Sequence, residues 1–304
     1  MKFLTFERGG CRAGLVINER IYDVENSASF LHLESEYSSD LISLIRTREI
    51  GELKSLARQL KDLDRGHEEL PLQCWASIDE VELHAPIPRP GKIICLGLNY
   101  RDHATEQNAK IPDNPLLFVK ASTSTTGHNR PIVIPDGSTK VDFEAELAFV
   151  IGKEVKGAGV NDAHSAIFGY TCMNDVTERE MQRGDRQWFR GKSPDTFAPM
   201  GPYIVTVDEF GDAGGVSVSS RLNGELMQLS STSNLIFTPG DIIKFVTRTM
   251  TLEPGDIIST GTPGGVGVFR DPPVFLKDGD TIEVIVDGIG TLSNPVVAQA
   301  SLEK

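Results

Sequence analysis

The stretch VDFEAELAFVI, residues 141–151, is the part of the chain that most directly indicates both fold and chemistry. Successive side chains of a β-strand point to opposite faces. One face of the strand predicted here is wholly apolar, and the other begins with Asp142, Glu144 and Glu146 before it too becomes apolar. The acidic side chains therefore lie where a strand enters a hydrophobic core.

Neighbouring carboxylates on one strand face lie about 6.7 Å apart. At an effective dielectric constant of about 20 they repel each other by about 2–3 kcal/mol. Water, basic side chains, protons or a metal ion must offset this repulsion. The simplest alternative is that this strand face is exposed to solvent.

A second apolar run, GYTCMND at residues 169–175, ends in another acid, Asp175. Glu144, Glu146 and Asp175 together could supply a three-carboxylate site for a hard divalent cation. Ligation by oxygen atoms alone favours magnesium, manganese or calcium over zinc.

The run GLNYRDHATE, residues 97–106, contains a candidate general base. His103 and Glu106 are three positions apart, so on a helical turn the carboxylate can orient the imidazole. Such a pair can deprotonate water. The alternative is an ion pair on the surface of a short helix.

Two lysines and a glycine-rich turn are candidate anion-binding groups. Lys120 ends the apolar run LLFVK and Lys192 lies within RGKSP. Either could bind a substrate carboxylate or stabilise an enolate, and the alternative is an ordinary lysine with its charged end in solvent. The turn GTPGGVG, residues 261–267, lacks the ending of a nucleotide-binding P-loop. Its backbone N–H groups and the Thr262 hydroxyl could hold a carboxylate.

The chain is predicted to contain a small N-terminal α+β domain, residues 1–83, and a larger domain, residues 92–304. The segment HAPIPRPG, residues 84–91, has prolines at alternate positions that impose an extended linker. Apolar residues at helical spacing predict helix over residues 39–63, split near Gly51. Beyond the linker, short β-prone runs dominate without regular alternation with helices, which indicates a mainly β, sandwich-like or barrel-like domain.

Composition excludes several classes of protein. The 304 residues include 30 Lys plus Arg against 43 Asp plus Glu, a net charge of −13, which disfavours nucleic acid and anionic membranes as partners. No apolar run approaches the roughly 20 residues that span a bilayer. The four cysteines form no Cys-x-x-Cys pair, which argues against a zinc site or a disulfide scaffold. Charges interrupt the position of a secretion signal, so a cytoplasmic protein is expected.

Several of these motifs, in this order, resemble the fumarylacetoacetate hydrolase family over about residues 81–295. The matching segments are GLNYRDH at 97–103, DFEAEL at 142–147, GYTCMND at 169–175, GKS at 191–193 and GTP at 261–263. The N-terminal domain resembles that of the longer bacterial members, which include oxaloacetate decarboxylase-like and acylpyruvate hydrolase-like proteins. The resemblance implies a mixed β-sandwich roll and a homodimer.

The resemblance also implies roles for individual residues. The metal ligands of the family, which bind Mg²⁺ or Mn²⁺, fall on Glu144, Glu146 and Asp175. The catalytic pair of its acylpyruvate-cleaving branch falls on His103 and Glu106. The positions that resemble substrate-contacting residues are Lys120, Arg179, Gln182, Lys192 and Thr262. One departure is Glu178, where many relatives have alanine.

The hypothesis is a metal-dependent enzyme that breaks a C–C bond of an acylpyruvate, 2,4-diketo acid or oxaloacetate-like 2-oxo carboxylate through a stabilised enolate. Hydrolysis would use water activated by His103, and decarboxylation would need no water. Two alternatives remain open: isomerisation or hydration of an unsaturated 2-oxo diacid at the same site, or a non-catalytic calcium-binding β-module.

Overall fold

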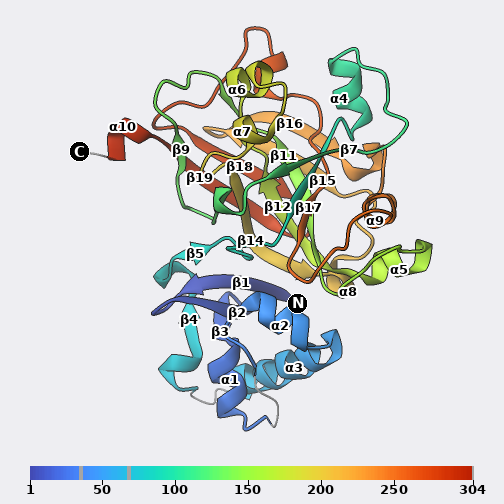
Figure 1. Ribbon diagram of the computed structural model, residues 1–304. Coiled ribbons are helices and arrows are strands. Elements are labelled where there is room, and N and C mark those ends of the chain that lie inside the picture. The colour runs from blue at the N-terminus through green and yellow to red at the C-terminus, as the bar shows by residue number, and fades with distance from the viewer. Residues whose placement is uncertain (34–36, 67–69, 303–304) are drawn as a thin grey trace.

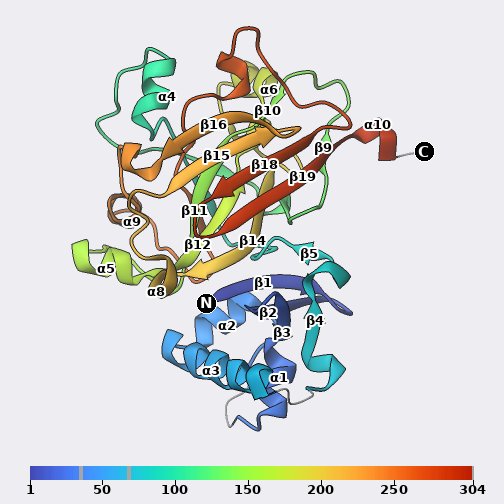
Figure 2. The same ribbon diagram turned by 180° about the vertical axis from the view of Figure 1, so that it is seen from behind.

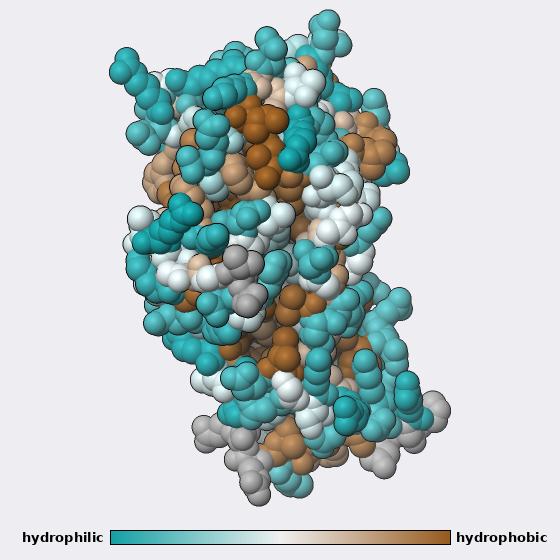
Figure 3. Space-filling view, turned by 90° about the vertical axis from the view of Figure 1, so that its right-hand side faces the viewer, coloured by the Kyte–Doolittle hydropathy of each residue, from teal (hydrophilic) through white to brown (hydrophobic). Residues whose placement is uncertain are grey.

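The computed structural model describes residues 1–33, 37–66 and 70–302. Figure 1 shows a smaller lobe built from the N-terminal part of the chain below a larger, mainly β lobe. The face seen in Figure 3 is mostly hydrophilic, with apolar residues gathered in patches between charged ones. Among the described residues, no helix combines the length and hydrophobicity that crossing a bilayer requires.

The N-terminal domain packs three helices against a small antiparallel sheet. The strands are β1 (Lys2–Glu7), β2 (Cys11–Ile17), β3 (Arg20–Asp23), β4 (Trp75–Ser77) and β5 (Leu83–His84). The helices are α1 (Val24–Phe30), α2 (Leu41–Thr47) and α3 (Ile50–Gly66). Their buried apolar faces enter one core with the strands, which gives the domain the predicted α+β character.

The predicted helical stretch at residues 39–63 is confirmed as two helices, but the break lies earlier than Gly51. The Asp40 side chain caps α2 by accepting from Ser43 N. Arg48 then adopts an extended conformation, and the Glu52 carboxylate accepts from Glu49 N at 3.0 Å. This local cap starts α3 at residue 50, so Gly51 lies in its first turn.

The sheet of the N-terminal domain continues into the larger domain. Strand β1 pairs antiparallel with β14 (Ala198–Thr206), with Phe3 opposite Ile204. The order is β4-β3-β2-β1-β14-β12-β11-β17-β6-β7. The strands not yet placed are β6 (Ile93–Gly97), β7 (Leu116–Lys120), β8 (Thr125–Thr126, beside β14), β11 (Ala145–Ile151), β12 (Ile167–Asn174) and β17 (Ile257–Ser259). A domain boundary at residues 84–91 stays a prediction, and the shared sheet shows that the two lobes are joined by more than that segment.

A second sheet packs against the first and completes a sandwich, seen from behind in Figure 2. Its order is β16 (Glu225–Ser231), β15 (Ser217–Leu222), β18 (Thr281–Val286), β19 (Gly290–Ala298) and β9 (Ile132–Ile134). Leu147 and Tyr170 of the first sheet share a core with Val218, Val284 and Leu292 of the second. The mainly β sandwich predicted from the short β-prone runs is therefore confirmed.

Short helices cover the ends of the sandwich. They are α4 (Arg101–Glu106), α5 (Val160–Ser165), α6 (Arg179–Gly184), α7 (Phe189–Lys192), α8 (Val207–Phe210), α9 (Pro239–Thr247) and α10 (Gln299–Leu302). In α9, Thr238 and Asp241 form a reciprocal capping box around Pro239. Figure 1 places α4, α6 and α7 at the end of the sandwich farthest from the N-terminal lobe.

The single strand predicted over residues 141–151 is wrong in its middle. The chain forms β10 (Val141–Asp142), which pairs with β13 (Thr177–Glu178), and then resumes as β11 at Ala145. Between them, Glu144 N donates to the Asn174 side chain instead of to a backbone carbonyl of a neighbouring strand. The solvent-exposed alternative for the acidic face is also wrong, because Glu144 is 7% exposed and Glu146 is 0% exposed.

Replacing Phe3 with alanine tests whether the two lobes unfold together. Phe3 is fully buried at the β1–β14 junction, with its ring 5.7 Å from that of Phe168. We expect the free energy of unfolding to fall by about 3–5 kcal/mol. Urea unfolding would be followed separately at Trp75 and Trp188, one in each lobe, in variants that keep only one of them. In a control, Leu72→Ala, at a 79% exposed position, stays within about 0.5 kcal/mol of wild type. A shift confined to the Trp75 transition would contradict joint unfolding.

Candidate active site

Three carboxylates converge at the end of the β11–β12 pair. Glu144 directly precedes β11, Glu146 lies within it, and Asp175 directly follows β12. Because the strands are antiparallel, with Ala145 opposite Asn174, these positions meet at one edge. Asp175 N also donates to Glu144 O at 2.9 Å. The three residues offer oxygen atoms that lie within 4.8 Å of one another, and all three side chains are buried.

Basic side chains compensate two of these carboxylates. Lys192 donates to Glu144 at 2.9 Å and to Asp175 at 2.5 Å. Arg179 lies 2.6 Å from Glu144 and also binds Asp142. Burial alone would raise the pKa of Glu144, but Lys192 and Arg179 outweigh it and hold that pKa below its usual range. Glu144 is therefore a carboxylate anion under ordinary conditions.

Glu146 has no basic partner among the described residues. Its Oε2 accepts from the Ser259 hydroxyl and from Gly261 N, at 3.0 Å for the latter. Its Oε1 is buried without a hydrogen-bond partner in the described part of the chain. Burial raises the pKa of Glu146 well above its usual range, and the negative charges of Asp175 and Glu144 raise it further. A divalent cation would supply the missing partner for Oε1 and the missing positive charge.

The donor set fits a hard metal ion. The cluster consists of carboxylate oxygens only, on two adjacent strand ends, and one of those oxygens has no hydrogen-bond partner within the described ranges. Such ligands suit magnesium, manganese or calcium. The buried group therefore has the composition and the uncompensated charge of a divalent metal site.

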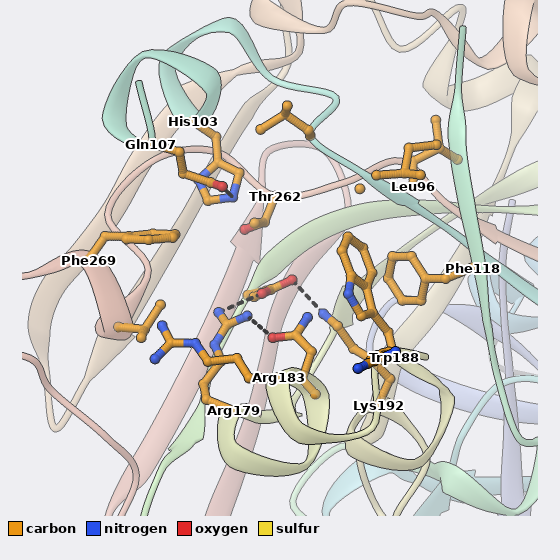
Figure 4. Close-up of a pocket in the computed structure, with 17 residues that line it drawn as sticks. Leu96, His103, Gln107, Phe118, Arg179, Arg183, Trp188, Lys192, Thr262 and Phe269 are labelled. Atoms are coloured by element: carbon orange, nitrogen blue, oxygen red, sulfur yellow. Dashed lines mark hydrogen bonds and ion pairs between the residues drawn. The ribbon is translucent and has the colours of Figure 1, made fainter. Parts of the chain in front are cut away.

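A cavity of about 540 Å³ opens above this cluster. Glu144 lines it, whereas Glu146 and Asp175 lie beneath the surface. In Figure 4, His103 lies at one end of the cavity, while Arg179 and Lys192 lie at the other. A small anion in the cavity would thus lie between an imidazole and the carboxylate cluster.

His103 and Glu106 form the predicted pair on α4, in which His103 is buried, with 6% of it exposed. His103 Nδ1 lies 3.0 Å from Glu106 Oε2, and Glu106 Oε1 accepts from Gly265 N at 2.9 Å. Gln107 Nε2 lies 2.6 Å from His103 Nε2. Since the Gln107 amide donates, this network assigns the imidazole proton to Nδ1 and leaves Nε2 as the basic atom.

The two predicted substrate-binding lysines occupy different places. Lys192 lines the cavity, and its ammonium group lies 4.9 Å from the centre of the Phe118 ring. Lys120 instead lies beneath Asp175, outside the cavity lining, and donates to Asp175 at 2.5 Å and to Val176 O at 3.0 Å. Burial lowers the pKa of Lys120. Its position suits it to hold Asp175 rather than to contact a substrate.

The remaining predicted residues, Arg179, Gln182 and Thr262, all line the cavity. Arg179 Nη1 donates to Gln182 Oε1 at 3.0 Å. The Thr262 hydroxyl donates to Ala145 O at 3.0 Å and accepts from Gln228 at 2.8 Å. Their roles toward a substrate stay predictions.

Tight packing of α7 on α6 positions Lys192. A side chain at Gly191 would meet Gln182 N at 2.6 Å and Glu178 O at 2.8 Å. Only glycine allows the two helices to approach this closely. The following residue, Lys192, is thereby directed onto the carboxylate cluster.

Sequence analysis missed several residues that shape the cavity. Gln107 could have been found, because it lies one helical turn after His103. Phe118 and Phe269 gave no signal beyond hydrophobicity. Ser259, which donates to Glu146, lies far away in the chain, and no local pattern connects the two.

The chain matches the family model "Fumarylacetoacetate (FAA) hydrolase C-terminal" over residues 92–297. It is 41% identical over 302 residues to oxaloacetate tautomerase YisK of Bacillus subtilis, covering 97% of this chain and 100% of the relative. A solved fumarylacetoacetate hydrolase from Exiguobacterium antarcticum superposes with a TM-score of 0.80 at 38% identity, covering 98% of this chain and 100% of that one.

A second solved relative was determined with a metal ion. Maleylpyruvate hydrolase from Sphingobium sp. SYK-6, in complex with manganese(II) ion and pyruvate, superposes with a TM-score of 0.76 at 30% identity, covering 98% of this chain and 99% of that one. The match to the family model, the full-length similarity to a relative and the shared fold all point to the same family. The chain belongs to the fumarylacetoacetate hydrolase family.

Proposed function

We propose that this protein is a metal-dependent tautomerase that interconverts the keto and enol forms of a small 2-oxo dicarboxylic acid such as oxaloacetate. The single observation that carries the proposal is that the basic Nε2 of His103 and the cluster carboxylate Glu144 border the same cavity. The full-length similarity to an oxaloacetate tautomerase supports the choice of reaction.

The metal would be one Mg²⁺ or Mn²⁺ ion, held by Glu144, Glu146 and Asp175. When bound, such an ion supplies Lewis-acid polarisation of a 2-oxo group. Lys120 keeps Asp175 in place from below. Arg179 keeps Glu144 in place from the side.

His103 moves the proton in this proposal. Glu106 orients the ring through Nδ1, so that Nε2 can take the proton from carbon 3 of the keto form and deliver it to the 2-oxygen, which completes the enol; the return to the keto form moves the same proton from the 2-oxygen back to carbon 3. Gln107 has to release Nε2 before the substrate can approach that atom. Lys192 donates to the substrate oxygen on which negative charge develops. Gln182 and Thr262, with Arg179, border the space that the substrate carboxylate would fill.

Hydrolysis of an acylpyruvate is the second candidate. A histidine oriented by a glutamate can also activate water, and a relative with this fold bears the name maleylpyruvate hydrolase. The C–C cleavage predicted from sequence, including decarboxylation, therefore remains a competing activity of the same site. A homodimer and a cytoplasmic location also stay predictions.

A substrate comparison tests the proposed reaction. Purified protein would be assayed with and without Mg²⁺, Mn²⁺ and chelator for three activities: decay of the enol absorbance of oxaloacetate, carbon dioxide release from oxaloacetate, and acetopyruvate cleavage. We expect metal-dependent enol decay to be the fastest. Faster acetopyruvate cleavage would favour the hydrolase, and no turnover together with tight Ca²⁺ binding would favour a non-catalytic module.

Replacing His103 with glutamine separates the base from the metal site. We expect the tautomerisation rate to fall by about 10²–10⁴-fold, the usual contribution of a general base. Binding of Mn²⁺, measured by calorimetry, should stay at the wild-type level, because His103 is not part of the carboxylate cluster. His164→Gln on α5, outside the cavity, is the matched control. Wild-type tautomerisation by the His103 variant would contradict the assigned base.

Replacing Glu146 with glutamine tests the metal site itself. Loss of a group that only orients a metal ligand typically lowers metal affinity by roughly 10–100-fold. Because Glu146 would itself be a ligand, we expect Mn²⁺ affinity to fall by more than this. The control is Glu180→Gln, because Glu180 is paired with Lys140 outside the cluster. Titration by calorimetry gives both affinities, and circular dichroism confirms the fold. Unchanged Mn²⁺ affinity in the Glu146 variant would remove this carboxylate from the metal site.

A further inference from the structure

The cavity has a strongly cationic wall in a strongly acidic chain. The charged side chains that line it, besides His103, are Glu144, Arg179, Arg183, Arg186 and Lys192. The chain as a whole carries a net charge of −13. The lining thus has four basic side chains and one carboxylate, so it carries a positive charge although the chain as a whole is negative. Such a lining suits an anionic ligand.

Two of the four cations are already engaged. Arg179 binds Asp142 and Glu144, and Lys192 binds Glu144 and Asp175. Arg183 and Arg186 make no hydrogen bond or ion pair with any residue in the described ranges 1–33, 37–66 and 70–302. Their charges are thus available to a ligand.

The acidic residues nearby do not neutralise these two arginines. Asp185 pairs with Arg190 at 2.6 Å, and Glu180 pairs with Lys140 at 2.7 Å. Glu178 instead caps α6 by accepting from Met181 N at 2.5 Å. Each carboxylate between the metal cluster and α7 therefore has a partner other than Arg183 or Arg186.

The geometry of α6 sets the spacing. Arg183 lies four residues after Arg179, so the two side chains share one face of the helix, and Figure 4 shows them next to each other. Four residues advance a helix by about 6 Å. Arg179 holds the cluster carboxylate Glu144, so Arg183 reaches a point about one turn away from the cluster. This offset is comparable to the distance between the two carboxylates of a short dicarboxylic acid.

Arg186 adds a second, independent observation. Its φ of 61° lies in the left-handed region, where an arginine is conformationally unfavourable. The side chain nevertheless lines the cavity. Backbone strain of this kind is found preferentially at active sites and at segments that hold a ligand.

We propose that Arg183 and Arg186 form a subsite for the second carboxylate of the substrate and thereby select 2-oxo dicarboxylates over 2-oxo monocarboxylates. The inference rests on the proposed function, in which the first carboxylate and the 2-oxo group of the substrate bind at the metal cluster. The subsite accepts the distal carboxylate through charge-assisted hydrogen bonds from the guanidinium groups.

The test compares oxaloacetate with its 4-ethyl ester, which has the same backbone but no distal charge. Wild-type protein should turn over and bind the diacid in preference to the ester. In Arg183→Gln combined with Arg186→Gly, the ratio of the two kcat/KM values should fall by about 10–100-fold, the usual loss for hydrogen bonds to a charged group. Glycine at 186 suits the left-handed backbone, so the variant is expected to fold.

Arg190→Gln is the matched control, because Arg190 pairs with Asp185 and does not line the cavity. Its ratio should equal that of wild type. An unchanged ratio in the double variant, or an equal loss for diacid and ester, would overturn the subsite.

A binding measurement distinguishes failure of the subsite from failure of the proposed function. The shift in melting temperature is recorded for metal-loaded wild-type and variant protein with diacid or ester. If wild-type protein catalyses no tautomerisation but is stabilised more by the diacid, and the double variant loses that difference, the subsite stands and the proposed reaction fails. Equal stabilisation of wild type by both compounds would overturn the subsite.

Discussion

Buried charge at the end of the sandwich is the constraint on which the rest of the structure depends. The groups that meet there are Asp142, Glu144, Glu146, Asp175, Lys120, Arg179 and Lys192. Bringing so many ions out of water is unfavourable unless each is paired. Within the described part of the chain, each of them has an oppositely charged partner except Glu146, whose unpartnered oxygen and raised pKa leave one place for a further positive charge.

The surrounding architecture keeps these ions in register. In the antiparallel pair β11–β12, β11 carries Glu146 and β12 ends beside Asp175. The β10–β13 pair holds Asp142 next to Arg179. The glycine at 191 lets α7 pack on α6, which places Lys192 over the cluster. Because a closely packed interior permits few alternative positions, the proposed metal ligands are held in one arrangement before a metal or substrate would bind. Such preorganisation is what electrostatic stabilisation of an enolate requires.

In the proposed function, proton transfer and metal binding belong to different parts of the fold. The His103–Glu106 pair lies on the short helix α4, which follows β6, whereas the carboxylates lie on central strands of the sheet. A base on a separate element can serve tautomerisation or water activation without disturbing the ion cluster. Relatives of this chain bear the names of both tautomerases and hydrolases. The proposed subsite, Arg183 on α6 and Arg186 just after it, would offer a further means of choosing among substrates.

The sequence by itself determined which acidic side chains were candidates for a common site, the His103–Glu106 spacing and the mainly β character of the larger domain, because these depend on residue type, local order and periodicity along the chain. That the three acids meet depends on the pairing of β11 with β12. Tertiary structure alone decided that β1 extends the larger sheet, that the strand predicted at residues 141–151 is interrupted, and that Lys120 lies behind Asp175. It also decided that Arg183 and Arg186 have no hydrogen-bond or ion-pair partner among the residues that the structure describes. These features depend on which segments, distant in the chain, come into contact when the core closes, and no local pattern encodes the distance between a buried carboxylate and the cations around it.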